Sequence, residues 1–231
     1  MGREVIIACD FASGQETLRF LERFGEARPY VKIGMELFYA EGPPVVRALK
    51  ARGHRIFLDL KLHDIPNTVE RAMRALSRLE VDLVNLHAAG TRAMMEAALR
   101  GLTREDGSRP RLIAVTQLTS TSPESLRDEL LVTEPMEKTV LHYARNAKAA
   151  GLDGVVCSPL EAAAVHRACG ADFLAVTPGV RFPDSRADDQ KRVTTPKLAR
   201  ELGADCIVVG RPITAAEDPA EAYGRCVREF V

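Results

Sequence analysis

The chain has 231 residues, of which 46% are hydrophobic, 28% are charged and 5% are aromatic. A chain of this length buries about 70% or more of its unfolded surface, so it needs neither disulfides nor a metal to hold its core. The 32 basic residues balance the 32 acidic ones, which argues against a protein that binds nucleic acid or an anionic membrane surface.

No part of the sequence approaches the roughly 18 consecutive apolar residues of a membrane span. The first residues, 1–6, lack the apolar region of a signal peptide. The five cysteines form no Cys-x-x-Cys pair, and three of them lie in or at the end of apolar runs. We therefore expect reduced, buried cysteines in a cytoplasmic protein.

Eight short segments rich in apolar residues recur along the chain, about 29 residues apart. Nearly continuous apolar strands are typical of a parallel sheet that is buried on both faces. The predicted strands, in chain order, are Val5–Cys9, Tyr30–Ile33, Arg55–Asp59, Leu83–Leu86, Leu112–Thr116, Gly154–Cys157, Phe173–Thr177 and Cys206–Val209.

The segments between these strands carry the periodicity and the end signals of helices. Ser13 and Glu16 have the spacing of a capping box at the start of the first helix. Near the end of the sequence, Asp218 followed by Pro219 predicts the first turn of the last helix. Strands therefore alternate with helices along the chain.

Eight such β-then-α units predict an α/β fold, a single-domain (β/α)₈ TIM barrel over residues 1–231 with its parallel sheet closed into a barrel. A doubly wound open sheet is the alternative. That fold normally has fewer strands and a glycine fingerprint after the first one, and residues 10–14 do not match Gly-x-Gly-x-x-Gly.

The third predicted strand leads into a cluster of charged residues: Asp59, Lys61 and Asp64. Because side chains alternate along a strand, Asp59 and Lys61 are expected to share a face, which at the C-terminal end of a barrel strand is the active-site mouth. At about 4 Å and an effective dielectric near 20, each carboxylate attracts the ammonium by on the order of 4 kcal/mol. The anions favour a charged Lys61 that can donate a proton, and Lys32 would add a fourth charge.

Two other interpretations of this cluster remain open. It could be a buried salt-bridge network that only ties strand ends together, although such networks stabilise a fold poorly compared with apolar packing. It could also hold a lysine that forms a Schiff base, although that chemistry needs a neutral amine and two carboxylates favour the charged one.

Glycine and arginine follow the last two predicted strands: Gly179 and Arg181 after the seventh, Gly210 and Arg211 after the eighth. Loops at these positions, with a helix N-terminus, are where barrels commonly bind phosphate. The glycines let backbone N–H groups approach an anion, and an arginine adds a charge-assisted hydrogen bond. The alternative is that the glycines serve turns and the arginines face solvent.

The segment Phe57–Val69, with the sequence FLDLKLHDIPNTV, resembles the signature of the orotidine 5′-phosphate decarboxylase family. Five further blocks match in the family's order and extend the resemblance over essentially the whole chain: 10–13, 31–34, 115–120, 176–181 and 208–211. The resemblance implies the cofactor-free decarboxylation of orotidine 5′-monophosphate (OMP) to UMP and CO₂, the last step of UMP biosynthesis.

The same resemblance implies roles for individual residues. Lys61 is expected to protonate the C6 carbanion, while Asp59 and Asp64 hold it charged and in place. A homodimer is expected, with Asp64 and Thr68 contributed across the interface. Gln190 is expected at the phosphate. The residues expected to contact the substrate are Asp10, Lys32, Thr68, Thr119, Ser120, Arg181, Gln190, Gly210 and Arg211.

No metal is expected at this site. The sequence has no paired histidines and no cysteine–histidine cluster with the spacing of a transition-metal site. Asp10, Asp59 and Asp64 carry the ligand type that Mg²⁺ prefers, but the interleaved Lys32 and Lys61 would compete with the cation.

Two other functions fit parts of the pattern. The Asp-x-Lys-x-x-Asp triplet also occurs in related Mg²⁺-dependent decarboxylases of keto-sugar phosphates, although residues 116–120 favour the pyrimidine substrate. A non-catalytic barrel that binds UMP is the second alternative, although binding alone does not need a charge cluster beside the base.

Overall fold

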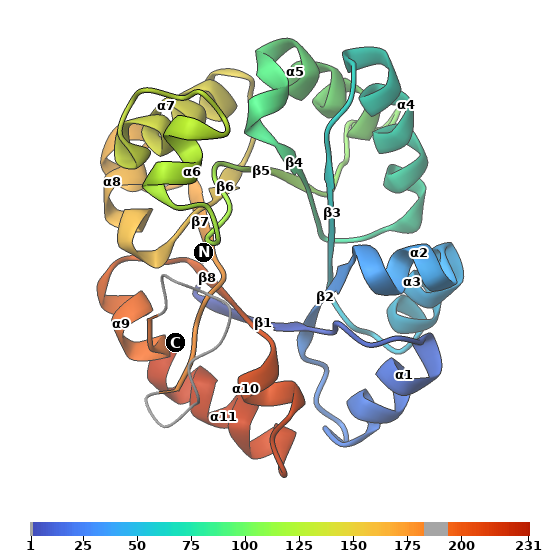
Figure 1. The fold of residues 1–231 in the computed structure, drawn as a ribbon. Coiled ribbons are helices and arrows are strands. Elements are labelled where there is room, and N and C mark those ends of the chain that lie inside the picture. Colours follow the sequence, from blue (N-terminus) through green and yellow to red (C-terminus); the bar gives the residue numbers. More distant parts are fainter. Residues whose placement is uncertain (1, 183–193) are drawn as a thin grey trace.

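The computed structural model describes residues 2–182 and 194–231, and within them eight parallel strands close into a barrel (Figure 1). Each strand pairs with the next along the chain, and β1 completes the circle by pairing with β8. The strands are β1 (Glu4–Ala8), β2 (Tyr30–Gly34), β3 (Ile56–Leu62), β4 (Leu83–His87), β5 (Arg111–Val115), β6 (Gly154–Val156), β7 (Leu174–Thr177) and β8 (Cys206–Val209). The predicted (β/α)₈ barrel is confirmed, and the open sheet is excluded.

Helices surround the barrel on its outer side (Figure 1). They are α1 (Gly14–Glu22), α2 (Met35–Glu41), α3 (Pro43–Ala51), α4 (Pro66–Leu76), α5 (Thr91–Leu102), α6 (Pro123–Asp128), α7 (Met136–Ala149), α8 (Pro159–Cys169), α9 (Pro196–Glu201), α10 (Arg211–Thr214) and α11 (Pro219–Phe230), with two short 3₁₀ helices, η1 (Ser77–Leu79) and η2 (Ala88–Gly90). Among the helices in the described ranges, none combines the length and the apolar character needed to cross a bilayer.

Several helix ends follow the local signals in the sequence. Ser13 accepts a hydrogen bond from the backbone N–H of Glu16 (3.2 Å) at the start of α1, and Asp218 accepts two from the first turn of α11. A capping box with both reciprocal bonds is formed by Ser158 and Glu161 on α8. These bonds satisfy N–H groups that the first turn of a helix leaves without partners.

Apolar side chains form two cores, one on each face of the sheet. One core lies between the strands and the helices, and the other fills the inside of the barrel. On β3, Leu58 and Leu60 belong to the outer core and Phe57 belongs to the inner one. Asp59 is two residues after Phe57, and because side chains alternate along a strand, its carboxylate also points to the inside of the barrel. All five cysteines are free and buried, as predicted.

Helices α4 and α5 approach each other closely at a glycine. A Cβ atom on Gly101 of α5 would clash with the backbone oxygen of Glu70 in α4. We expect Gly101→Ala to lower the free energy of unfolding by about 3 kcal/mol, because overpacking this contact forces the two helix backbones apart. Denaturant unfolding of the variant and the wild type measures the difference.

The matched control is Gly224→Ala on α11, where the added methyl group would meet only the ends of two flexible side chains, Arg228 at 3.2 Å and Glu221 at 4.0 Å. Alanine favours a helix over glycine by about 1 kcal/mol, so we expect this variant to be at least as stable as the wild type. Equal losses in the two variants would contradict the close approach of α4 and α5.

Candidate functional site

A cavity of about 310 Å³ lies at the C-terminal ends of the strands, where barrel enzymes carry their active sites. Its wall is charged along β2 and β3 and combines polar with apolar side chains after β5 and β7. The lining residues are Lys32, Phe57, Asp59, Lys61, Val115, Gln117, Leu118, Thr119, Ser120, Val156, Cys157, Pro178 and Val208. Five predicted site residues meet in this cavity: Lys32, Asp59, Lys61, Thr119 and Ser120.

A larger cavity, of about 470 Å³, lies at the opposite, N-terminal ends of the strands. Two of its arginines are held in ion pairs, Arg55 with Glu4 at 2.7 Å and Arg109 with Asp153. These carboxylates already bind the guanidinium groups, and TIM-barrel enzymes carry their active sites at the other end. We therefore place the candidate site at the C-terminal ends of the strands.

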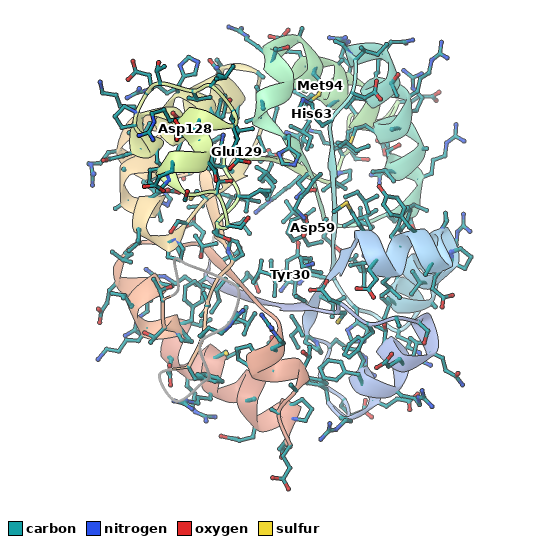
Figure 2. All side chains as sticks on the ribbon, viewed as in Figure 1. Tyr30, Asp59, His63, Met94, Asp128 and Glu129 are labelled. Carbon is teal, nitrogen blue, oxygen red and sulfur yellow. The ribbon has the colours of Figure 1, made fainter. Side chains whose placement is uncertain are left out.

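Four side chains of alternating charge, Asp10, Lys32, Asp59 and Lys61, form a row that we call the charge row. The Lys32 ammonium lies 3.0 Å from one oxygen of Asp10 and 3.3 Å from Oδ2 of Asp59. The Lys61 ammonium lies 2.7 Å from Oδ1 of Asp59. Asp59, labelled in Figure 2, therefore stands between two cations at the inner side of the barrel.

Burial and charge act in opposite directions in this row. Only 7% of Asp59 and 9% of Lys32 are exposed. Burial alone would raise the pKa of the Asp59 carboxyl, but Lys32, Lys61 and the hydrogen bonds to the carboxylate outweigh it and hold the pKa below its ordinary value. Burial would likewise lower the pKa of Lys32, but the carboxylates of Asp59 and Asp10 hold it above its ordinary value. Both groups are therefore charged at neutral pH.

Lys61 reaches the cavity from a bulge in β3. Leu58 pairs with Val84 and Leu62 pairs with Leu86, so an advance of four residues along β3 corresponds to an advance of only two residues along β4. Within the bulge, Lys61 has a φ of 50°, a left-handed conformation that is uncommon for a residue with a side chain. The predicted meeting of Asp59 and Lys61 is found, but a bulge and not regular strand alternation produces it.

Asn85 on β4 is a site residue that the sequence analysis missed. Its side chain is buried, and its Nδ2 donates a hydrogen bond to Oδ1 of Asp59 (2.7 Å). Its Oδ1 accepts a hydrogen bond from the backbone N–H of Lys61 (2.8 Å). The signal in the sequence was a single amide inside the apolar run 83–86, which a buried strand carries only when the amide has partners.

Gly34 is a second residue that sequence reasoning did not select. It pairs with Asp59 across β2 and β3. A Cβ atom there would lie 3.0 Å from Oδ1 of Asp10 and 3.1 Å from Nζ of Lys32. A larger residue would therefore press on the ion pair at the outer end of the charge row.

Asp64 and Thr68 lie away from the charge row within one chain. Both are exposed, and the Asp64 carboxylate accepts a hydrogen bond from the backbone N–H of Ile65 (2.6 Å). Across the described ranges, no ion pair joins Asp64 to Lys61. The structure of a single chain therefore does not bring Asp64 into the cluster that the sequence suggested.

The predicted phosphate residues surround the ends of β7 and β8. Gly210 follows β8 directly, and the exposed Arg211 begins α10. After β7, Arg181 is partly buried, and its backbone N–H donates a hydrogen bond to the carbonyl of Thr194 (2.9 Å). Gln190 lies outside the described residues.

The described part of the chain contains no group of three or more His, Cys, Asp or Glu side chains arranged to hold a metal ion. In the charge row, the Lys32 ammonium already stands between the carboxylates of Asp10 and Asp59. A cation at that point would have to displace a lysine. The expectation that the site works without a metal stays a prediction.

The charge row makes stability depend on pH in a defined direction. Because the pKa of Asp59 is lowered in the folded state, its contribution is fully present above the ordinary carboxyl value of 3.8 and is lost as the pH falls through the lower folded value. We expect Asp59→Asn to lower the free energy of unfolding by about 3 kcal/mol at pH 7, because two cations lose their shared partner. The difference from the wild type should shrink below pH 3.8. Unfolding curves at several pH values test this, and a difference that is independent of pH would contradict it.

Comparisons with known proteins show the family of the chain. Residues 3–226 match the model of the family described as "Orotidine 5'-phosphate decarboxylase / HUMPS family". A relative named orotidine 5′-phosphate decarboxylase from Geobacillus sp. (strain WCH70) is 57% identical and covers 100% of this chain and 98% of its own length. Another of that name, from Bacillus caldolyticus, is 58% identical and covers 97% of this chain and 93% of its own length.

A crystal structure of orotidine 5′-phosphate decarboxylase from Lactobacillus acidophilus is 45% identical, with a TM-score of 0.88 and coverage of 99% of both chains. A second crystal structure, of an uncharacterized conserved protein from Geobacillus kaustophilus, is 52% identical, with the same TM-score and coverage of 98% of this chain and 100% of that one. Family model, relatives and structures agree over nearly the whole length. The chain belongs to the orotidine 5′-phosphate decarboxylase / HUMPS family.

Proposed function

We propose that this protein decarboxylates OMP to UMP and CO₂ without a cofactor, and that Lys61 delivers the proton to C6 of the pyrimidine. The observation that carries the proposal is the charge row, in which the Lys61 ammonium lies 2.7 Å from Asp59 at the wall of the cavity. The relatives named orotidine 5′-phosphate decarboxylase support the same reaction.

The chemistry explains why such a row is useful. Breaking the bond between C6 and the carboxylate leaves an electron pair in the plane of the ring, where the π system cannot delocalise it. The barrier is therefore high, and a fixed positive charge beside C6 lowers it most effectively in a site that excludes water. The Lys61 ammonium supplies this charge and then transfers its proton to C6. The neutral amine regains a proton from solvent, so that the overall reaction consumes one proton and releases CO₂.

Asp59 has two roles in this proposal. It fixes the Lys61 ammonium, and it faces the point where the substrate carboxylate enters. Placing two anions near each other weakens binding of the charged carboxylate in the ground state, and this repulsion is relieved when CO₂ leaves. Lys32 keeps the Asp59 carboxylate charged throughout.

We propose that the nucleotide lies across the mouth of the barrel and contacts the other predicted residues. Asp10 and Lys32 are proposed to bind ribose hydroxyls, and Thr119 and Ser120 to meet the pyrimidine edge. The residues proposed for the phosphate are Arg181, Gln190, Gly210 and Arg211. Since the phosphate is remote from C6, its binding energy serves to close the site and position the base, which raises turnover as well as affinity.

The main rival is a Mg²⁺-dependent decarboxylase of a keto-sugar phosphate. The charge row disfavours it, because the carboxylates of Asp10 and Asp59, which would have to coordinate a divalent cation, are already paired with Lys32 and Lys61. A non-catalytic UMP-binding barrel is disfavoured because burying the charges of Lys32 and Asp59 brings no benefit to binding alone.

A spectroscopic assay of OMP consumption in EDTA tests the reaction and the role of Lys61 together. We expect the wild type to turn over in EDTA and Lys61→Ala to lose at least ~10³-fold in kcat, because general-acid catalysis and the fixed cation are both removed. UMP should still bind to the variant, since the ribose and phosphate contacts remain. Turnover of Lys61→Ala within tenfold of the wild type would rule out the assigned role, and loss of wild-type activity in EDTA would favour the metal-dependent rival.

We propose further that the protein is a homodimer in which Asp64 and Thr68 of each subunit complete the site of the other. Asp64 and Thr68 are exposed at the same end of the barrel as the charge row. Two large apolar side chains are exposed in the segments that follow the adjacent strands β2 and β3: Tyr39 in α2 is 72% exposed, and Ile65, next to Asp64, is 66% exposed. A two-fold interface over this rim would bury these side chains and bring a second carboxylate toward Lys61.

Hybrid dimers test the shared site. Lys61→Ala and Asp64→Ala should each be nearly inactive, but a mixture of the two that has exchanged subunits should recover about one quarter of wild-type activity, because half of the dimers are hybrids and one of their two sites is intact. The matched control is a mixture of Lys61→Ala with Asp59→Asn. It should recover nothing, because one subunit supplies both Lys61 and Asp59 of a row, so each row in the hybrid dimer carries one of the two changes. Equal recovery in the two mixtures, or none in either, would contradict the proposed interface.

A cytoplasmic location completes the proposal. Its support is that all five cysteines are free and buried, as is usual in a reducing compartment.

A further inference from the structure

We propose that Asn85 is a positioning residue for the decarboxylation: it fixes the backbone of Lys61 and the carboxylate of Asp59 relative to each other. The inference rests on the proposed function. Asn85 lies at the centre of β4, 1% exposed, and it contacts both members of the pair through one amide group.

The first contact, from the Lys61 backbone to Asn85, replaces a backbone hydrogen bond that the bulge in β3 removes from the sheet. Where β3 bulges, the regular ladder with β4 stops after Leu58 and resumes at Leu62. The backbone N–H of Lys61 therefore faces β4 out of register, and the side-chain oxygen of Asn85 accepts it at 2.8 Å. This bond holds Lys61 in its left-handed conformation, with a φ of 50°, and thereby sets the direction in which its side chain leaves the strand.

The second contact orients the carboxylate. Oδ1 of Asp59 accepts hydrogen bonds from the Asn85 amide (2.7 Å) and from the Lys61 ammonium (2.7 Å), while Oδ2 faces Lys32. With both oxygens engaged, the Asp59 side chain has little freedom to rotate. The ammonium is thus held at one point of the cavity wall.

The two partners also determine which way the amide faces. A backbone N–H requires an oxygen, and a carboxylate requires a donor, so only one orientation of the Asn85 amide satisfies both. Aspartate at this position would keep the acceptor for Lys61 but would set a second anion against Asp59. Leucine would fill a similar volume and would remove both bonds.

The charged and titratable groups that face Asp59 are Lys32 from β2, Lys61 from β3 and His87 from β4. Removing the amide donor leaves these groups in place and takes away one hydrogen bond to the charged form of the carboxyl. Protonation of Asp59 then becomes easier, which a purely structural change elsewhere in the core would not cause.

Asn85→Leu and Asn85→Asp are compared with the wild type by measuring kcat and KM for OMP between pH 3 and 9, UMP affinity, and unfolding. We expect kcat of Asn85→Leu to fall about 100-fold, because a small displacement of the ammonium misaligns it with C6, while KM and UMP affinity stay within about threefold. The acid limb of the kcat profile should move up by about one pH unit, and further in Asn85→Asp.

The matched control is Ser77→Ala after α4, which also removes a hydrogen bond of a buried side chain, at 2.9 Å from Ser77 to the carbonyl of Arg74, but next to residues 80–83, which line the cavity at the opposite end of the barrel. It should lose stability without a change in kcat or in the acid limb. If Asn85→Leu does not fold, Asn85→Ala provides the same measurement with less steric demand.

The outcomes separate this inference from the proposed function. A wild type that is inactive in EDTA overturns the proposed function, and the role of Asn85 falls with it. An active wild type, together with an Asn85→Leu variant whose kcat is within threefold of it and whose acid limb is unmoved, overturns the role of Asn85 alone.

Discussion

The site depends on one electrostatic constraint: the two buried charges, Lys32 and Asp59, need their neighbours in the row to stay charged. An isolated carboxylate or ammonium buried beside the inner core would be driven to its neutral form, because the protein interior solvates ions poorly. Alternation of sign removes this difficulty, since Asp59 lies between Lys32 and Lys61, and Lys32 lies between Asp10 and Asp59. The row therefore acts as a unit, and its geometry is fixed before any ligand enters.

In the barrel, the strand ends and the loops that follow them contribute different groups to this site. The ends of β2 and β3, with Asp10 just after β1, hold the charges, while the segment after β5 lines the cavity with the polar side chains of Gln117, Thr119 and Ser120. A reaction without a cofactor has only the protein's own charges to stabilise its transition state. Preorganised charges on strands suit that need better than charges on loops.

Much of the architecture could be predicted from the sequence because it rests on local patterns. Eight apolar strands and their helix signals were sufficient for the barrel, and the residue spacing in segment 59–64 drew attention to the charged cluster. The end of β3 was placed too early, at Asp59 instead of Leu62, because a run of charges looks like a loop when its pairing partners are unknown. The bulge at Lys61 and the role of Asn85 depend on the register between two strands, which the order of residues alone does not reveal. The meeting of Asp64 with Lys61 across a homodimer interface stays a prediction.

Closure of the barrel has a consequence for how the protein is made. β1 bonds to β2 on one side and to β8 on the other, so Glu4 pairs with Cys206. On the ribosome, the first strand emerges long before its last neighbour has been synthesised, and one edge of the growing sheet stays open throughout translation. Such an edge can pair with another nascent chain, so the interval before the final strand arrives is the period of greatest exposure to misassembly.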